Sequence, residues 1–214
     1  MLLTLLSPRY EPNMKIVLAT ENEGKLKEIQ LFFKDLPINV VSQLEFNMPS
    51  AIESGLSFIE NAIIKARHAA KFAHLPALAD DSGLVVDALG GKPGIYSARF
   101  AGPTANSLDN IHKLLNEMSA VPEKDRSAHF YCALAFVRSF DDPAPIIALG
   151  RWDGTLLTQQ QGEGGFGYDP IFYIKEHSCT AAQLSPAQKN TLSHRAKALQ
   201  QFYSQFQDYL SSQQ

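Results

Sequence analysis

Two adjacent carboxylates, Asp80 and Asp81, lie within the apolar stretch ALADDSGLVV at residues 77–86. Burying an unpaired carboxylate is costly, so such a pair needs a shifted pKa, a cationic partner or a metal ion. Consecutive strand residues point to opposite faces, so both carboxylates can serve one site only if the chain turns, which Ser82-Gly83 permits. The pair predicts either a positively charged site or a turn bonded only to local backbone.

Further acidic groups precede this stretch. Glu53 lies in the irregular segment SAIESG, and Glu60 and Asn61 stand at the start of a predicted helix. Oxygen ligands gathered from separate segments suit Mg²⁺, which keeps several waters and bridges substrate phosphates. Glu60 also completes a capping-box pattern with Ser57, and that structural role remains equally open.

The segment ATENEGK (19–25) connects a predicted strand to a predicted helix through a polar turn. Backbone N–H groups at a helix start, together with Lys25, can hold a phosphate. The spacing is not that of a Walker A loop. An ordinary strand-to-helix turn with a solvated lysine is the alternative interpretation.

The segment GEGGFGYDP (162–170) places four glycines around Phe166 and Tyr168. Glycines let the backbone approach a flat ligand closely, and aromatic rings offer a stacking face, so this segment can hold a nucleobase. A flexible hairpin loop is the alternative.

In KNTLSHR (189–195), Ser193 is a candidate N-cap, which places His194 and Arg195 in the first helical turn. Cations are disfavoured there by about 0.3–1 kcal/mol because of the helix dipole. The cost suggests that these side chains are directed at hydrogen-bond acceptors of a ligand, although surface charges without a function would have the same pattern.

The elements that must position these residues alternate along the chain. Strands are expected at 15–20, 38–44, 77–89, 128–139, 145–158 and 171–174, and helices at 23–33, 57–73, 107–118 and 193–210. The segment 77–89 is expected to be a strand pair or a strand broken at 81–83, and 128–158 a long hairpin. Alternation predicts an α/β fold with a mixed sheet, and the long hairpin suggests a second lobe with a ligand cleft between the lobes.

Composition limits the classes of function. The 214 residues are 45% hydrophobic and 19% charged, which suits one domain, and the net charge of −3 gives no general attraction to nucleic acid or to an anionic membrane. Cys132 and Cys179 are expected to be reduced thiols in a cytoplasmic protein. Residues 1–13 are expected to be a disordered extension, followed by a single domain over 14–214.

Taken together, the segments LATENEGK, ESGLSFIENAIIKA, ALADDSGLVVDALGGKPGIYSAR, GGFGYDPIF and SHR closely resemble the inosine/xanthosine triphosphate pyrophosphatases, over residues 15–195. The resemblance implies an elongated mixed α/β fold with two lobes and a central cleft, usually in a homodimer. It also implies hydrolysis of non-standard purine nucleoside triphosphates (ITP, dITP and XTP) to the monophosphate and pyrophosphate, with Mg²⁺.

The resemblance also implies roles for individual residues. Asp81 would be the catalytic base and, with Glu53, a metal ligand, while Asp80 would support them structurally. The substrate-binding residues would be Thr20, Asn22, Lys25, Lys65 and Ser82 toward the phosphates and Phe166, Gly167, Tyr168, Asp169, Lys189, His194 and Arg195 toward the base.

Two positions depart from the family pattern: Glu21 stands where glycine is usual, and Gln183 where an acidic residue is common. Glu21 is tolerable if its φ is negative and its carboxylate points outward; otherwise it repels the triphosphate. Three alternatives therefore stay open: a related pyrophosphatase that prefers other nucleotides, a protein that binds nucleotides without turnover, and a structural domain without a ligand.

Overall fold

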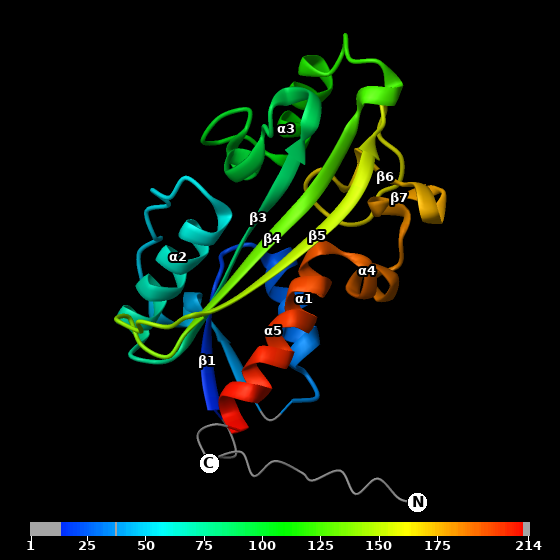
Figure 1. Ribbon diagram of the computed structural model, residues 1–214. Coiled ribbons are helices and arrows are strands. Elements are labelled where there is room, and N and C mark those ends of the chain that lie inside the picture. Colours follow the sequence, from blue (N-terminus) through cyan, green and yellow to red (C-terminus); the bar gives the residue numbers. More distant parts are fainter. Residues whose placement is uncertain (1–13, 37, 212–214) are drawn as a thin grey trace, which may run out of the picture.

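The structure is a computed structural model that describes residues 14–36 and 38–211. One mixed sheet forms its centre (Figure 1). Its seven strands lie in the order β2–β1–β3–β4–β5–β6–β7. β1 pairs in parallel with β2 and β3, and the other neighbours are antiparallel. The strands are β1 Met14–Ala19, β2 Ile38–Ser42, β3 Ala77–Val86, β4 Ser127–Val137, β5 Ile146–Leu156, β6 Phe172–Ile174 and β7 Cys179–Thr180. The predicted mixed α/β sheet is confirmed.

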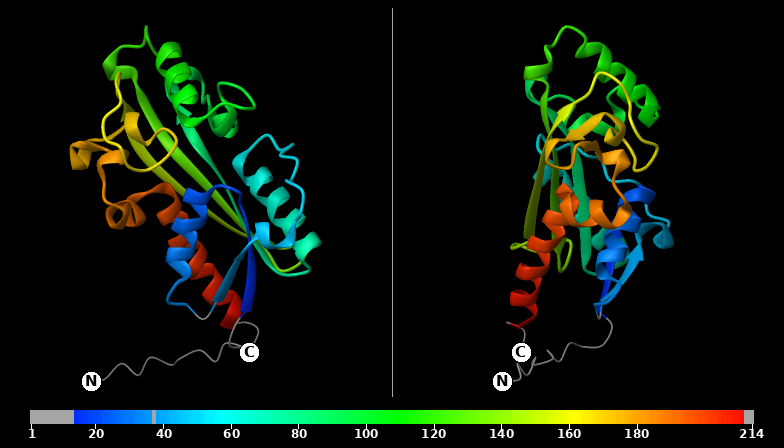
Figure 2. Two further views of the ribbon diagram at one scale, coloured as in Figure 1. Left: turned by 180° about the vertical axis from the view of Figure 1, so that it is seen from behind. Right: turned by 90° about the vertical axis from the view of Figure 1, so that its right-hand side faces the viewer.

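Helices cover both faces of this sheet (Figure 2). α2 (Phe58–Ala73) packs on β3 and β4 through small side chains such as Ala62, Ala66 and Ala69. α1 (Glu23–Phe33) and α5 (His194–Ser211) share the apolar cluster on the opposite face, where Phe202 and Phe206 are fully buried. The alanine layer lets α2 approach the strands closely, whereas bulky rings fill the space under α5.

The far end of the sheet has its own core. α3 (Ser107–Glu117) packs there with the ends of β3, β4 and β5, around Phe130, Trp152 and Phe172. β4 and β5 are 11 residues long each, so the hairpin that they form extends from one core to the other. The long hairpin predicted from the sequence is confirmed, and it links the two ends of the molecule.

β3 is a continuous strand of ten residues, so the predicted break at 81–83 was wrong. β4 pairs with β3 along its whole length, Ala77–Val86, and so keeps the strand extended through 81–83, whereas β1 pairs only with Ala77–Ala79. Gly83 lies directly against the 3₁₀ helix η3 (Gly94–Arg99), where an added Cβ would be 2.4 Å from Ser97 Oγ and 2.5 Å from the Gly94 carbonyl oxygen. The glycine therefore serves a close contact within a strand rather than a turn.

The C-terminal helix begins as predicted, but the short helix before it, α4 (Pro186–Leu192), was not predicted. Ser193 lies between the two helices, and its Oγ accepts a hydrogen bond from the Ala196 N–H (3.2 Å). The first turn of α5 rests directly on β5, because an added Cβ at Gly150 would lie 1.9 Å from the His194 carbonyl oxygen. The absence of a side chain at Gly150 therefore sets the position of this turn.

The start of α2 settles the two readings of Glu60. Ser57 Oγ accepts a hydrogen bond from the Glu60 N–H (3.2 Å), while the Glu60 carboxylate accepts from the Leu56 N–H (3.0 Å) and from Ser57 Oγ (2.7 Å). Half of the predicted capping box is therefore present: Ser57 caps the Glu60 N–H, but the Glu60 carboxylate bonds the Leu56 N–H instead of the Ser57 N–H.

The structure does not test two of the sequence predictions. Residues 1–13 lie outside the described residues, and the division of the rest into one domain with two lobes stays a prediction. Within residues 14–36 and 38–211, no helix combines the length and the apolar character needed to cross a membrane.

Candidate active site

Asp80 and Asp81 point to opposite faces of β3. Asp80 lies on the face covered by α1 and α5, among Lys25, Cys132 and Arg195, whereas Asp81 lies on the face covered by α2, beside Lys65. This follows from the alternation of an unbroken strand. The two carboxylates therefore belong to two different clusters of polar side chains.

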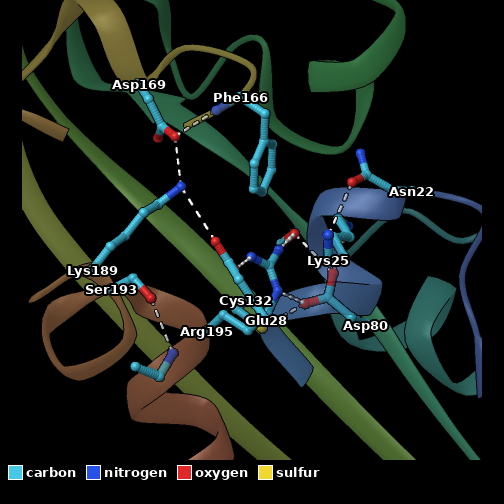
Figure 3. A network of polar contacts seen from close by, with 12 residues as sticks. Asn22, Lys25, Glu28, Asp80, Cys132, Phe166, Asp169, Lys189, Ser193 and Arg195 are labelled. Atoms are coloured by element: carbon cyan, nitrogen blue, oxygen red, sulfur yellow. Dashed lines mark hydrogen bonds and ion pairs between the residues drawn. The ribbon is translucent and has the colours of Figure 1, made fainter. Parts of the chain in front are cut away.

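The Asp80 carboxylate is fully paired by groups of the chain itself (Figure 3). Lys25 Nζ donates to Oδ1 at 2.5 Å, and Arg195 Nε donates to Oδ2 at 2.8 Å. Ser82 Oγ (2.9 Å) and Cys132 Sγ (3.1 Å) complete the shell. Burial by itself raises the pKa of Asp80, but Arg195 and Lys25 outweigh burial and hold this pKa well below its ordinary value.

Glu28 joins this cluster, and sequence reasoning missed it. Its Oε2 accepts from Arg195 Nη1, and its Oε1 lies 3.4 Å from Lys189 Nζ. Glu28 follows Lys25 by three residues on α1, so both side chains lie on the same side of the helix. That spacing was the available signal, but a glutamate near a lysine on a helix is usually a solvated pair.

The hydrogen-bond donors of Arg195 are bonded to side chains of the protein itself. Its guanidinium contacts Asp80, Glu28 and Ser82, and the side chain is 1% exposed. The unfavourable position at a helix start is therefore offset by two carboxylates. That the cation is directed at a ligand stays a prediction. Burial lowers the pKa of Arg195, but the negative charges of Asp80 and Glu28 outweigh burial, so that this pKa is raised.

The second cluster surrounds Asp81. Lys65 Nζ donates to Asp81 Oδ1 (2.6 Å) and lies 3.0 Å from Glu53 Oε1, while Arg99 Nη1 donates to Glu53 Oε2 at 3.0 Å. Burial raises the pKa of Asp81, and Lys65 opposes this only in part. Burial also raises the pKa of Glu53, but Lys65 and Arg99 outweigh it and lower this pKa. The pKa values of the two carboxyl groups are thus shifted in opposite directions.

This second cluster fits a divalent cation. Asp81 Oδ2 is buried and has no hydrogen-bond partner, which leaves one lone-pair-bearing oxygen for a ligand that the protein itself does not supply. No group of three or more histidine, cysteine, aspartate or glutamate side chains with metal-site geometry occurs in the described part of the chain. Two carboxylates, completed by water and substrate phosphates, match the way Mg²⁺ is usually bound.

The start of α1 carries the predicted phosphate-binding turn. Asn22 is the N-cap and accepts a hydrogen bond from the Lys25 N–H (3.0 Å), while Thr20 Oγ1 accepts from the Asn22 N–H (3.2 Å). These bonds fix the turn, and the lysine side chain reaches Asp80 from it. The N-terminus of a helix favours an anion, so the turn can hold a phosphate group.

A cavity of about 390 Å³ lies beside these groups. Its volume is within the range of small-molecule sites. It is lined by ten of the residues predicted from the sequence, namely Asn22, Lys25, Ser82, Phe166, Gly167, Tyr168, Asp169, Lys189, His194 and Arg195. Thr20, Glu53, Lys65 and Asp81 are not part of this lining. The predicted base-side residues therefore gather around one cavity, and the Asp81 cluster lies outside its wall.

The two aromatic residues of the segment 162–170 have different positions: Phe166 lies in the cavity wall, and Tyr168, which also lines the cavity, is buried. The Phe166 ring lies 4.2 Å from Lys189 Nζ and packs against Gly24, where an added Cβ would be 2.8 Å from the ring. Tyr168 is 4% exposed, and its hydroxyl donates to the Ser97 carbonyl oxygen (2.9 Å). Phe166 can therefore stack on a base, whereas Tyr168 mainly anchors the loop to η3.

Asp169 and Lys189 form a buried ion pair at 2.5 Å, and Asp169 also accepts from the Phe166 N–H (2.8 Å). Burial raises the pKa of Asp169, although Lys189 opposes the rise. The pair holds the loop of Phe166 against α4 (Figure 3). Both residues keep the shape of the cavity wall that a base would meet.

His194 lines the cavity, and one of its ring nitrogens has no hydrogen-bond partner. Its ring stacks on Phe130 with centroids 4.8 Å apart, and Nδ1 is buried without a hydrogen-bond partner. Burial, with the nearby positive charge of Arg195, lowers the pKa of His194 well below its ordinary value. The imidazole is therefore neutral at neutral pH, and its ring nitrogens can recognise a ligand by hydrogen bonds without adding charge.

The two departures from the family pattern have local explanations. Glu21 is not among the described non-glycine residues with positive φ, and its carboxylate accepts hydrogen bonds from Ser50 Oγ (2.5 Å) and Gln43 Nε2 (3.3 Å). Gln183 closes a short cap, its Oε1 accepting from the Thr180 N–H (2.9 Å). Glu21 thus meets both conditions for being tolerated.

Comparison with known proteins extends these observations. Residues 16–205 match the Ham1 family. A dITP/XTP pyrophosphatase of Vibrio cholerae is 55% identical over 189 residues, covering 88% of this chain and 94% of that protein. A dITP/XTP pyrophosphatase of Photobacterium profundum is 54% identical over 194 residues, covering 91% and 98%. A solved HAM1 protein from Coxiella burnetii has a TM-score of 0.85 and 48% identity, covering 91% of this chain and 99% of that chain.

Proposed function

Because the chain belongs to the Ham1 family, we propose that it hydrolyses non-standard purine nucleoside triphosphates, namely ITP, dITP and XTP. The products are the nucleoside monophosphate and pyrophosphate. The observation that carries this proposal is the union of a base-sized cavity with a helix-start phosphate turn, since Asn22 and Lys25 of the turn also line the cavity. A nucleotide has both parts, so one molecule can occupy both.

Hydrolysis requires a water molecule to attack the α-phosphorus. The water oxygen forms a bond to this phosphorus while the bond to the α–β bridging oxygen breaks, and pyrophosphate leaves with that electron pair. Asp81 takes the proton of the water; its raised pKa makes it a better proton acceptor than an ordinary aspartate once it is ionised. Lys65, which already bonds Asp81, lies where it can also offset the charge of the phosphates.

We propose that the divalent cation of this reaction is Mg²⁺, held by Glu53 and Asp81. When bound, the ion neutralises phosphate charge and so stabilises the departing pyrophosphate. The lowered pKa of Glu53 keeps this carboxylate ionised at neutral pH, as a metal ligand must be. Removing the ion with EDTA is expected to abolish turnover, and added Mg²⁺ to restore it.

Selection of the base follows from the groups at the cavity. Hypoxanthine and xanthine carry a carbonyl oxygen at the 6-position, where adenine carries an amino group. Hydrogen-bond donors from the His194–Arg195 turn would bond that carbonyl and leave adenine mismatched. His194 is the stronger candidate among the two side chains, because the Arg195 guanidinium is already engaged with Asp80 and Glu28.

A substrate panel tests the proposed function. Pyrophosphate release is measured from ITP, dITP, XTP, GTP, ATP and a modified pyrimidine triphosphate, with and without Mg²⁺. Metal-dependent release from the first three, far above release from ATP, is the expected result. A preference for the pyrimidine would assign the chain a different nucleotide, and binding of ITP without release would make it a nucleotide sensor.

We also propose that the protein acts as a homodimer in the cytoplasm, where its nucleotide substrates are found. Light scattering coupled to gel filtration measures the mass directly, and one chain has a mass of 23.6 kDa. A mass of about one chain at working concentrations would contradict the dimer without affecting the reaction.

A further inference from the structure

η3 (Gly94–Arg99) stands between the cavity and the Asp81 cluster. Ser97 and Ala98 line the cavity, whereas the next residue, Arg99, is directed to Glu53. The backbone of η3 is held firmly: Ser97 Oγ accepts from the Leu84 N–H (2.9 Å), and the Ser97 carbonyl accepts from Tyr168 Oη (2.9 Å). Arg99 is therefore a partly exposed side chain on a backbone that is held in place.

The Arg99 guanidinium is incompletely used. Among the residues that the structure describes, Glu53 Oε2 is the acceptor of this side chain, bonded to Nη1 at 3.0 Å. The Arg99 side chain is 37% exposed, and its guanidinium carbon lies 5.3 Å from the centroid of the Tyr96 ring. Nε and Nη2 thus keep donors for a further acceptor, in the planar arrangement that suits phosphate oxygens.

Two cationic side chains lie beside the single negative charge of Glu53. Lys65 and Arg99 both pair with it, and Lys65 also pairs with Asp81. Binding of a divalent cation at Glu53 would add a third positive neighbour and weaken the Arg99 contact. The side chain would then be repelled from Glu53 at the moment when phosphate groups arrive nearby.

We infer that Arg99 binds the β- and γ-phosphates of the substrate and remains bound to the departing pyrophosphate. The inference rests on the proposed function and adds a residue to the candidate site. With the base in the cavity and the α-phosphate near Asp81, Arg99 lies one residue beyond the cavity wall, on the side of the carboxylates. Its cation then stabilises the negative charge that develops on the leaving group.

Binding of inorganic pyrophosphate tests this inference directly. Calorimetry measures its Kd with Arg99→Met and Arg99→Lys, in EDTA and in Mg²⁺, alongside kcat/KM for ITP and the Kd of IMP. We expect Arg99→Met to weaken pyrophosphate binding and to lower kcat/KM by about 10-fold or more, because a charged bidentate contact is lost. IMP affinity is expected to stay unchanged, and Arg99→Lys to retain part of the binding.

The matched control is Arg151→Ala, since Arg151 is another arginine paired with a carboxylate, Asp153, at 2.8 Å on the surface. An unchanged pyrophosphate Kd in Arg99→Met, with a higher Mg²⁺ concentration at half-maximal activity, would overturn the inference and make Arg99 only a support of Glu53. So would a wild-type protein that binds no pyrophosphate. Wild-type protein that releases no pyrophosphate from ITP would instead remove the proposed function.

Discussion

The two faces of β3 treat identical side chains in opposite ways. Asp80 is 1% exposed and Asp81 is 6% exposed, so burial hardly distinguishes them. Asp80 is bonded by Lys25, Arg195, Ser82 and Cys132, and its pKa is held well below the ordinary value. Asp81 has an oxygen without a partner, and its pKa is raised.

This difference in hydrogen bonding distinguishes a structural carboxylate from one that can take part in a reaction. A buried carboxylate whose acceptors are all used stabilises the arrangement of its partners but has no free lone pair for a substrate, a metal or a proton. A buried carboxylate with an open oxygen retains that capacity. The proposed reactive role of Asp81 therefore rests on its incomplete hydrogen bonding rather than on the depth of its burial.

The largest effect is expected from Asp81→Asn. An amide cannot take the proton of the attacking water, so kcat for ITP should fall by about 10²–10⁴-fold, the usual contribution of a general base. Nucleotide affinity, measured by calorimetry with a slowly hydrolysed analogue, should change far less. Equal losses of affinity and of kcat would remove Asp81 from the role of base.

Asp80→Asn should act on stability. It leaves Lys25 and Arg195 without their shared counter-charge, and breaking a buried ion pair in this way costs about 3–5 kcal/mol. For a chain of this size, Tm should fall by roughly 10 °C in differential scanning calorimetry. Asp153→Asn, at an exposed pair with Arg151, serves as the control and should leave Tm nearly unchanged. A Tm loss no larger than that of the control would erase the distinction between the faces.

The pH dependence should report on Asp81. The base must be ionised, so kcat/KM should fall as pH falls through the pKa of Asp81, which burial raises and the proposed Mg²⁺ would lower. Lys65 favours the ionised form, so Lys65→Met should move this acid limb to higher pH. A pH–rate profile at saturating metal measures the acid limb of the wild-type protein and that of Lys65→Met. An acid limb that stays in place or moves to lower pH would show that another group controls it.

The smallest effect is expected from Glu21→Gly. The Glu21 carboxylate is bonded to Ser50 and Gln43, and its backbone does not need positive φ. We expect kcat/KM for ITP to change by less than about 3-fold, in keeping with the loss of exposed hydrogen bonds. A clear rise in activity would show instead that the carboxylate repels the triphosphate.

The fold was largely predictable because local patterns carry it. Period-two and helical spacing located the long strands and helices, and the capping sequence at Ser57 located the start of α2. α4 was missed although Ser185, Pro186 and Gln188 form a start signal, with a capping box confirmed in the structure. At seven residues the helix is too short to show a clear apolar period.

The site was less predictable, because its contacts join distant segments. The break in β3 was expected because two buried carboxylates lacked a visible counter-charge, yet Asp80 pairs with Arg195, 115 positions away in sequence. Glu28 meets the same Arg195 across 167 positions. Local spacing cannot reveal such partners, whereas the family resemblance supplied most of the residues around the cavity.

The tight contact at Gly83 bears on how the chain folds. Sliding β3 by one residue along β4 would exchange the faces of Asp80 and Asp81; in one direction Arg195 would face Ala79, and in the other it would face Asp81. Such a misaligned sheet would also place Ser82 or Leu84 where an added Cβ comes within 2.4 Å of Ser97 Oγ. That steric overlap selects against the inactive alignment during assembly, so a residue with no side chain protects the placement of two charged ones.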